Sequence, residues 1–214
     1  MSADFVLPRI KVCGTCRLID ALVAVEAGAD AIGMVFHEAS PRSVPLPAAL
    51  RIAANLPPTV LPVGVYVDAD PERTLEHATI AGVRMVQLCG SQRAEDWRAF
   101  PLPLLRRLGV DAAAADELEA WRGIAAGFVL DHPSAPGGTG RQVDAALAAQ
   151  LAAAAPCLLA GGLDETRVAA AIHAVHPFGV DAASRLETAP GRKDPDRVRA
   201  FVRAAHSALE ECAA

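Results

Sequence analysis

The chain has 214 residues, of which 52% are hydrophobic and 21% are charged, and its formal net charge is −5. This composition excludes an intrinsically disordered chain and supplies a hydrophobic core of ordinary size. Because the charges form neither basic nor acidic runs, we expect no binding to nucleic acid or membrane surfaces, and small molecules are the expected partners.

Neither the beginning of the chain nor its most apolar run predicts a membrane segment. The opening residues, MSADFVLPRIKV, lack the charged region and apolar stretch of a secretion signal. The longest apolar run, 145–160, is interrupted by Gln150 and Pro156 and falls short of the roughly 20 residues of a membrane span. We therefore expect a cytoplasmic protein, whose five cysteines would be kept reduced.

In chain order, short apolar runs predict eight strands, each followed by a helix-like segment. The predicted strands span about 10–13, 31–35, 60–67, 84–88, 103–108, 126–130, 157–160 and 179–182. Glycine ends the helix-like segments in VEAGADAIGMVF and TIAGVRMVQL, as expected of a helix cap before a buried parallel strand. The fourth and fifth units are less regular than the others.

Eight repeated βα units predict an α/β fold. Because no linker or change of composition divides the chain, we expect one domain over residues 1–214, a closed (β/α)8 or TIM barrel. An open, doubly wound sheet is the alternative. A barrel of 214 residues is near the lower end of the usual size, so its loops must be short.

Polar residues that close the strands are the candidate functional residues, because barrel enzymes place their sites at the carboxyl ends of strands. These residues are Cys13, Arg42 after the second strand, Gln87, Cys89, Asp131 and Asp181. Each has a structural alternative. An aspartate at a strand end often caps a helix or a turn, and a cysteine alone is more often a packing residue.

Glycine-rich segments follow the last three strands: GGTG at 137–140, AGGLDE at 160–165 and DAASRLETAPG at 181–191. Loops after strands seven and eight form the usual phosphate site of a (β/α)8 barrel. We therefore expect phosphate binding by Gly161, Gly162, Ser184 and Arg185. Taken singly, a Gly-Gly pair is more often a turn.

Seven segments, in order and spacing, carry a resemblance to a known family. They are KVCG, GADAIGMVF…SPRSV, VGVYV, VQL-G, LD…GGTG, LAGGL and VDAAS-LE-APG-KD. From about Ile10 to Phe201 the chain resembles the phosphoribosylanthranilate isomerases, barrel enzymes of tryptophan biosynthesis. The resemblance implies an Amadori rearrangement of N-(5-phosphoribosyl)anthranilate to 1-(2-carboxyphenylamino)-1-deoxyribulose 5-phosphate, without metal or organic cofactor. We expect a monomer or a homodimer.

The resemblance also implies roles for individual residues. Asp131 would be the general acid that protonates the furanose oxygen, and Cys13 the general base that removes the C2 proton. Arg42 would face the anthranilate carboxylate. Gln87 and Asp181, as polar residues that close strands, are also expected to contact the substrate. These roles require a raised Asp pKa and a lowered Cys pKa, relative to ordinary values of about 3.9 and 8.5.

Four positions depart from the family pattern. Cys16 stands in place of Thr, Cys89 in place of His, Ala145 in place of an aromatic residue and Arg185 in place of Gly. If position 185 requires a positive φ, an arginine there would be strained. Cys89 removes a side chain able to hydrogen-bond the substrate.

Cys13 and Cys16 form a C-x-x-C frame, which also occurs in redox and zinc sites. Eight βα units are more than a thioredoxin-like fold contains, and zinc would need two further ligands. The nearest histidine pair, His173 and His176, lies in another helix-like segment, whose end His176 marks. Because the family has a helix-capping Thr at position 16, we interpret the frame as coincidence.

Three functions remain open. The first is the active isomerase. The second is a related sugar-phosphate isomerase, which would be expected to carry Asp in place of Cys13. The third is a paralogue that binds a phosphorylated ligand without turnover; the changed residues permit it, whereas the presence of both Cys13 and Asp131 argues against it.

Overall fold

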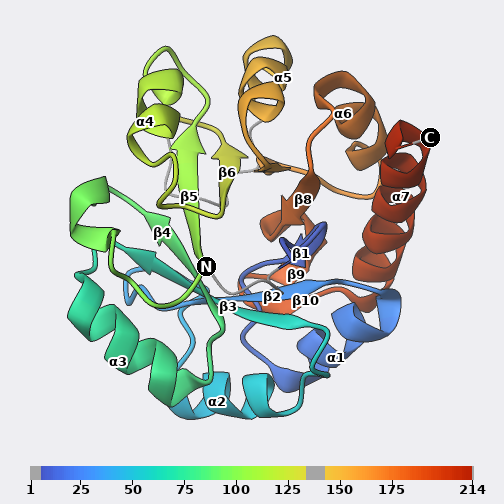
Figure 1. Ribbon diagram of the computed structural model, residues 1–214. Coiled ribbons are helices and arrows are strands. Elements are labelled where there is room, and N and C mark those ends of the chain that lie inside the picture. The colour runs from blue at the N-terminus through green and yellow to red at the C-terminus, as the bar shows by residue number, and fades with distance from the viewer. Residues whose placement is uncertain (1–5, 134–142, 214) are drawn as a thin grey trace.

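The computed structural model describes residues 6–133 and 143–213, and its eight parallel strands close into a barrel (Figure 1). The strands are β1 (Ile10–Val12), β2 (Ala31–Val35), β3 (Leu61–Val67), β4 (Met85–Cys89), β5 (Leu104–Gly109), β6 (Gly127–Asp131), β7 (Cys157–Leu159) and β8 (Gly179–Ala182). β1 pairs in parallel with both β2 and β8, which closes the ring. The predicted barrel is confirmed, and the open-sheet alternative is wrong.

Seven α-helices of the described chain surround the barrel. They are α1 (Leu18–Ala27), α2 (Leu46–Ala54), α3 (Pro71–Ala81), α4 (Ala114–Ala120), α5 (Ala145–Ala154), α6 (Val168–Val175) and α7 (Pro195–Ala213). Gly28, Gly82 and His176 end α1, α3 and α6 in the left-handed conformation, which confirms the predicted helix ends. None of the described helices is long and apolar enough to span a membrane.

The fourth and fifth units are short, in agreement with their irregular sequences. Between β4 and β5 the described chain forms only the 3-10 helix η1 (Ala94–Trp97), and the following segment contains Pro101 and Pro103, which disfavour a longer helix. The side chain of Trp97 is buried in the larger hydrophobic core and packs against Phe100.

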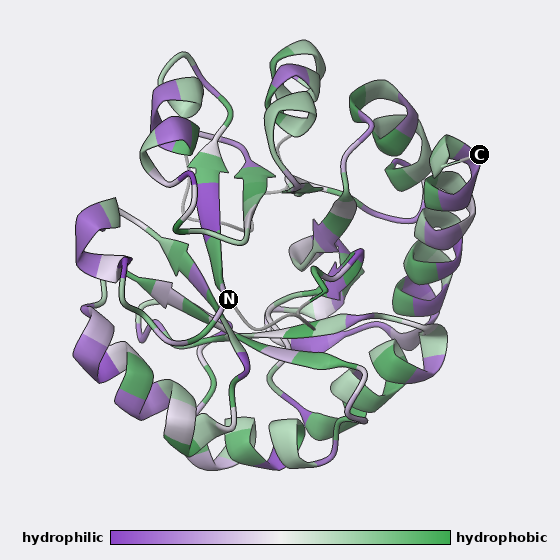
Figure 2. Cartoon of the chain, viewed as in Figure 1, coloured by the Kyte–Doolittle hydropathy of each residue, from purple (hydrophilic) through white to green (hydrophobic). Residues whose placement is uncertain are grey.

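Two hydrophobic layers hold the barrel together. The larger layer lies between the sheet and the helices, whose apolar faces are green toward the sheet in Figure 2. The smaller layer fills the barrel interior and includes Ala31, Val63, Met85, Leu105 and Val129. These residues fill the middle of the barrel, and a cavity opens above them toward the carboxyl ends of the strands.

The chain between β8 and α7 forms a small structure of its own. After β8 come the 3-10 helix η2 (Ser184–Leu186) and the strands β9 (Glu187–Ala189) and β10 (Arg192–Lys193), which pair antiparallel. Figure 1 shows this β9–β10 hairpin close to β1 and β2. The hairpin therefore lies next to the first strand of the barrel as well as the last.

Candidate active site

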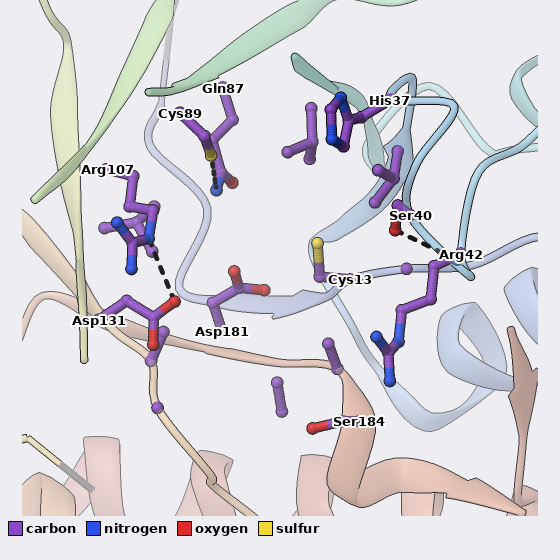
Figure 3. A pocket seen from close by; sticks show the side chains of 18 of the residues that line it. Cys13, His37, Ser40, Arg42, Gln87, Cys89, Arg107, Asp131, Asp181 and Ser184 are labelled. Carbon is purple, nitrogen blue, oxygen red and sulfur yellow. Dashed lines mark hydrogen bonds and ion pairs between the residues drawn. The ribbon is translucent and has the colours of Figure 1, made fainter. Parts of the chain in front are cut away.

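A cavity of about 300 Å³ opens at the carboxyl ends of the strands. Its lining contains every predicted site residue: Cys13, Arg42, Gln87, Asp131, Gly161, Gly162, Asp181, Ser184 and Arg185. Figure 3 shows the polar side chains converging on this space from different strands. The predicted segment GGTG at 137–140 lies outside the described residues.

The alternation of side chains along each strand explains this convergence. On β4, Met85 belongs to the interior layer, and Gln87, two residues later on the same face, reaches the cavity. On β6, Val129 and Asp131 repeat the arrangement. A polar residue two positions after an interior apolar residue therefore enters the cavity.

Cys13 follows β1 directly, and its sulfur points into the cavity (Figure 3). Its backbone N–H donates to the carbonyl of Ala182 at 2.8 Å. A Cβ atom on Gly33 would lie 2.7 Å from Cys13 Sγ, so a side chain at position 33 would displace the thiol. Burial raises the pKa of the Cys13 thiol, and Lys11 opposes that effect. The expectation of a lowered cysteine pKa is therefore wrong.

Lys11 and Asp181 form a buried ion pair below the thiol. Lys11 Nζ lies 2.7 Å from Asp181 Oδ2, and the two side chains are 0% and 7% exposed. Burial opposes the charge on Lys11, but the attraction and hydrogen bonding of Asp181 and Cys13 together outweigh it and raise the pKa of Lys11. The other oxygen, Asp181 Oδ1, is buried and has no hydrogen-bond partner among the described residues. Asp181 thus keeps one acceptor for a ligand.

Gln87 provides a second acceptor of this kind. Its Nε2 contacts Cys89 Sγ at 3.6 Å, whereas its Oε1 is buried and without a partner in the described part of the chain. Burial raises the pKa of Cys89 to about 11. Since unpaired buried acceptors are costly, Gln87 Oε1 and Asp181 Oδ1 favour a ligand that carries hydroxyl groups.

Asp131 ends β6 and contacts an arginine that the sequence analysis did not single out. Arg107 Nε lies 3.3 Å from Asp131 Oδ2, and Arg107 Nη2 donates to the carbonyl of His132 at 2.7 Å. Arg107 reaches the cavity from β5, two residues after the interior Leu105. That spacing along β5 was a signal by which the sequence could have shown Arg107.

Arg42 lines the cavity and is held by a buried carboxylate. Its Nε and Nη2 lie 3.0 Å and 2.9 Å from Glu187 Oε1 and Oε2, and the Glu187 side chain is 3% exposed. Such a two-point contact fixes the plane of the guanidinium group. Glu187 was part of the motif LE-APG-KD, but the sequence did not assign it a role.

The predicted phosphate-binding residues lie together at the cavity wall formed by the loops after β7 and β8. Gly161 and Gly162 adopt positive φ values of 89° and 67°, which favour glycine. Arg185 lies in η2 and is not among the described non-glycine residues with positive φ, so the condition under which an arginine would be strained at this position is not met. Ala145 begins α5, is exposed and does not line the cavity.

The two cysteines of the C-x-x-C frame have different surroundings. Cys16 is half-buried, and its thiol donates to the carbonyl of Arg42 at 3.2 Å. It does not line the cavity, and both cysteines are free thiols. Arg17, rather than Cys16, occupies the N-cap of α1, so the expected capping role of position 16 is wrong.

Replacing Cys16 with Thr is expected to leave kcat within about twofold of wild type, because the threonine hydroxyl can donate to the carbonyl of Arg42 as the thiol does. Tm should remain unchanged or rise slightly. The measurement is steady-state kinetics under reductant and again after mild oxidation. A loss of activity as large as that of a Cys13 variant, or a requirement for oxidation, would make the C-x-x-C frame functional.

A protein-family profile and sequence relatives point to the same family. The profile of the family described as N-(5'-phosphoribosyl)anthranilate (PRA) isomerase matches residues 10–204. The N-(5'-phosphoribosyl)anthranilate isomerase of Myxococcus xanthus is 42% identical over 205 residues, covering 93% of this chain and 96% of the relative. The enzyme of the same name from Pelobacter propionicus is 41% identical, covering 95% and 98%.

Solved structures agree with the sequence relatives. The phosphoribosyl anthranilate isomerase of Thermotoga maritima has a TM-score of 0.86 and 34% identity, covering 94% of this chain and all of that one. A phosphoribosyl anthranilate isomerase in complex with reduced 1-(o-carboxyphenylamino)-1-deoxyribulose 5-phosphate has a TM-score of 0.84 and 33% identity, with the same coverage.

Proposed function

The chain belongs to the N-(5'-phosphoribosyl)anthranilate isomerase family, and we propose that it rearranges N-(5-phosphoribosyl)anthranilate through Cys13 and Asp131. Its activity is that of an aldose–ketose isomerase, an intramolecular oxidoreductase, in L-tryptophan biosynthesis. One observation carries the assignment of these two residues: both reach the cavity of the barrel from different strands. A thiol and a carboxyl group then lie on separate walls around one bound sugar.

The first chemical step is opening of the furanose ring. Asp131 donates a proton to the ring oxygen while the C1–O bond breaks and the anthranilate nitrogen forms a double bond to C1. Donation requires Asp131 to be protonated, and a protonated Asp131 no longer forms an ion pair with Arg107. Arg107 retains the carbonyl of His132 as an acceptor, so its side chain stays in place during the step.

The second step is proton transfer between carbons. The Cys13 thiolate removes the C2 proton, which gives an enolamine. Protonation at C1 and loss of the C2 hydroxyl proton then yield the ketone. Since burial raises the pKa of Cys13, the positive charge of Lys11 is needed to oppose it. Gln87 and Asp181, each with a buried unpaired oxygen, would accept hydrogen bonds from substrate hydroxyls.

The remaining residues of the cavity would bind the two charged ends of the substrate, the anthranilate carboxylate and the 5′-phosphate. Arg42 would bind the anthranilate carboxylate with the donors that Glu187 does not use. At the other end, Gly161, Gly162, Ser184 and Arg185 would hold the 5′-phosphate. We further propose that residues 1–214 form one catalytic domain, which works as a monomer or a homodimer. A dimeric relative is known from Thermotoga maritima.

Inorganic phosphate or sulfate is expected to occupy the wall formed by Gly161, Gly162 and Ser184, because backbone N–H groups at these loops suit a dianion. Crystals grown in sulfate would show the ion there, and inorganic phosphate would inhibit turnover competitively with the substrate. An ion bound only elsewhere, together with noncompetitive inhibition, would contradict this placement.

Growth of a tryptophan auxotroph that lacks its own isomerase tests the function in a cell. We expect growth without tryptophan when the strain carries this gene, and no growth when the gene encodes Cys13→Ser. The Cys16→Thr gene is the matched control, because it changes a neighbouring cysteine outside the cavity. Failure of the wild-type protein to support growth, although it is present and folded, would contradict the proposal.

A further inference from the structure

Lys193 is a buried lysine whose three ammonium protons all have partners. Lys193 is only 2% exposed, and lysine is rarely buried to this extent. Lys193 Nζ donates to the carbonyl of Cys13 at 2.6 Å, to the carbonyl of Ala183 at 3.0 Å and to Glu187 Oε1 at 2.9 Å. An ammonium group has three donors, so these contacts use all of them.

The three partners belong to three separate parts of the proposed site. Cys13 carries the proposed base, Ala183 directly precedes the phosphate-binding Ser184, and Glu187 holds the guanidinium of Arg42. One ammonium group thus connects the end of β1, the loop after β8 and the arginine that would face the substrate carboxylate.

The β9–β10 hairpin that carries Lys193 is itself attached to α1. The backbone N–H of Lys193 donates to Asp20 Oδ2 at 3.2 Å, and Arg17 Nε donates to the same oxygen at 2.8 Å. Gly191, in the turn of the hairpin, has φ 74°, and a Cβ there would lie 3.1 Å from Cys16 Sγ. The hairpin is therefore held against the segment that follows Cys13 by the backbone N–H of Lys193, by its side chain and by the close approach of Gly191 to Cys16.

Burying an ammonium group is costly unless it is paired and hydrogen-bonded. Two carbonyls and one carboxylate meet that requirement here, and the hydrogen bond from Lys193 holds the Cys13–Gly14 peptide group, which adjoins the Cα atom that carries the thiol side chain. We propose that Lys193, together with Glu187, is a positioning pair for the isomerase reaction, holding the thiol of Cys13, the phosphate loop and Arg42 in one mutual geometry. The role in turnover rests on the function proposed above.

Replacing Lys193 with Met tests the proposal, because methionine keeps an unbranched side chain and removes the donors. We expect kcat/KM to fall by about 100-fold, the loss typical of a displacement of about 1 Å among reacting groups. The matched control is Arg84→Met. Arg84 also donates to two backbone carbonyls, those of Pro58 and Val60, but at the amino end of the barrel. This control is expected to keep kcat/KM within about threefold of wild type.

A second readout needs no substrate. The charged and titratable groups around Cys13 are Lys11 on β1, Asp181 on β8, Lys193 on β10 and Cys89 on β4. Alkylation of Cys13 by iodoacetamide, followed at each pH by peptide mass spectrometry, reports on that environment. Removal of the Lys193 charge should shift the alkylation midpoint to higher pH, whereas Arg84→Met should not shift it.

Each outcome decides the proposal. A Lys193→Met protein with kcat/KM within threefold of wild type overturns it, even if Tm falls. If the wild-type protein itself shows no turnover, the proposed function fails. An unshifted alkylation midpoint in Lys193→Met would separately overturn the link between Lys193 and Cys13.

If Lys193→Met does not fold, Glu187→Gln takes its place. It should raise KM about tenfold through Arg42, and an unchanged KM would overturn the proposal.

Discussion

Replacing Cys13 with Ser is expected to lower kcat by about 1000-fold or more while the fold survives. The change preserves size in a position that is 8% exposed and packed against Gly33. A hydroxyl is far less acidic than a thiol of ordinary pKa about 8.5, so serine cannot supply an anionic base. The measurement is kcat under reductant, with circular dichroism and Tm to show that the variant is folded.

The matched control for this variant is Cys16→Thr, which changes the other cysteine of the C-x-x-C frame and is expected to be almost neutral. A Cys89→Ser variant would show whether any thiol in the cavity affects turnover, since Cys89 lines the same space from β4. A folded Cys13→Ser protein with a kcat close to wild type would remove Cys13 from the mechanism.

Replacing Asp131 with Asn is expected to lower kcat by about 100-fold or more, with little change in fold. Asparagine retains the shape of the side chain but cannot donate a carboxylic acid proton to the ring oxygen. The substitution also removes the ion pair with Arg107, whose Nε lies 3.3 Å from Asp131 Oδ2. Kinetics of the purified variant, at several pH values, measure the loss.

Arg107→Lys separates the two effects of that substitution. It keeps a positive charge beside Asp131 and leaves the carboxyl group available, so its loss of kcat should be clearly smaller than that of Asp131→Asn. Equal losses would indicate that the ion pair, rather than the acid, matters. Near wild-type kcat in Asp131→Asn would exclude the acid role altogether.

Much of the fold was predictable because each strand is a short apolar run between clear helix ends. Gly28 and Gly82 marked where helices stop, and the eight units left few ways to arrange a parallel sheet. The positions of Cys13 and Asp131 followed from the rule that barrel sites lie at the carboxyl ends of strands.

The interactions among charged side chains were not predictable in the same way. Lys11 stands in the middle of the short buried run IKV, and its partner Asp181 is 170 residues away in the chain. Lys193 and Glu187 reach their partners only because the hairpin after β8 folds over β1. Since one sequence gives no distances across the barrel, neither pairing could be read from it. Alternation along β1 would, however, have placed Lys11 on the same face as Cys13.

Turnover of N-(5-phosphoribosyl)anthranilate by the purified wild-type protein, with the product identified by chromatography, tests the proposed isomerase activity itself. We expect many turnovers per protein molecule to 1-(2-carboxyphenylamino)-1-deoxyribulose 5-phosphate. We also expect a primary isotope effect when C2 carries deuterium and C–H cleavage limits the rate. The Cys13→Ser/Asp131→Asn double variant should form no product above the spontaneous reaction. A wild-type protein that binds the substrate but forms product no faster than the double variant would contradict the proposed activity and favour a phosphorylated-ligand-binding paralogue.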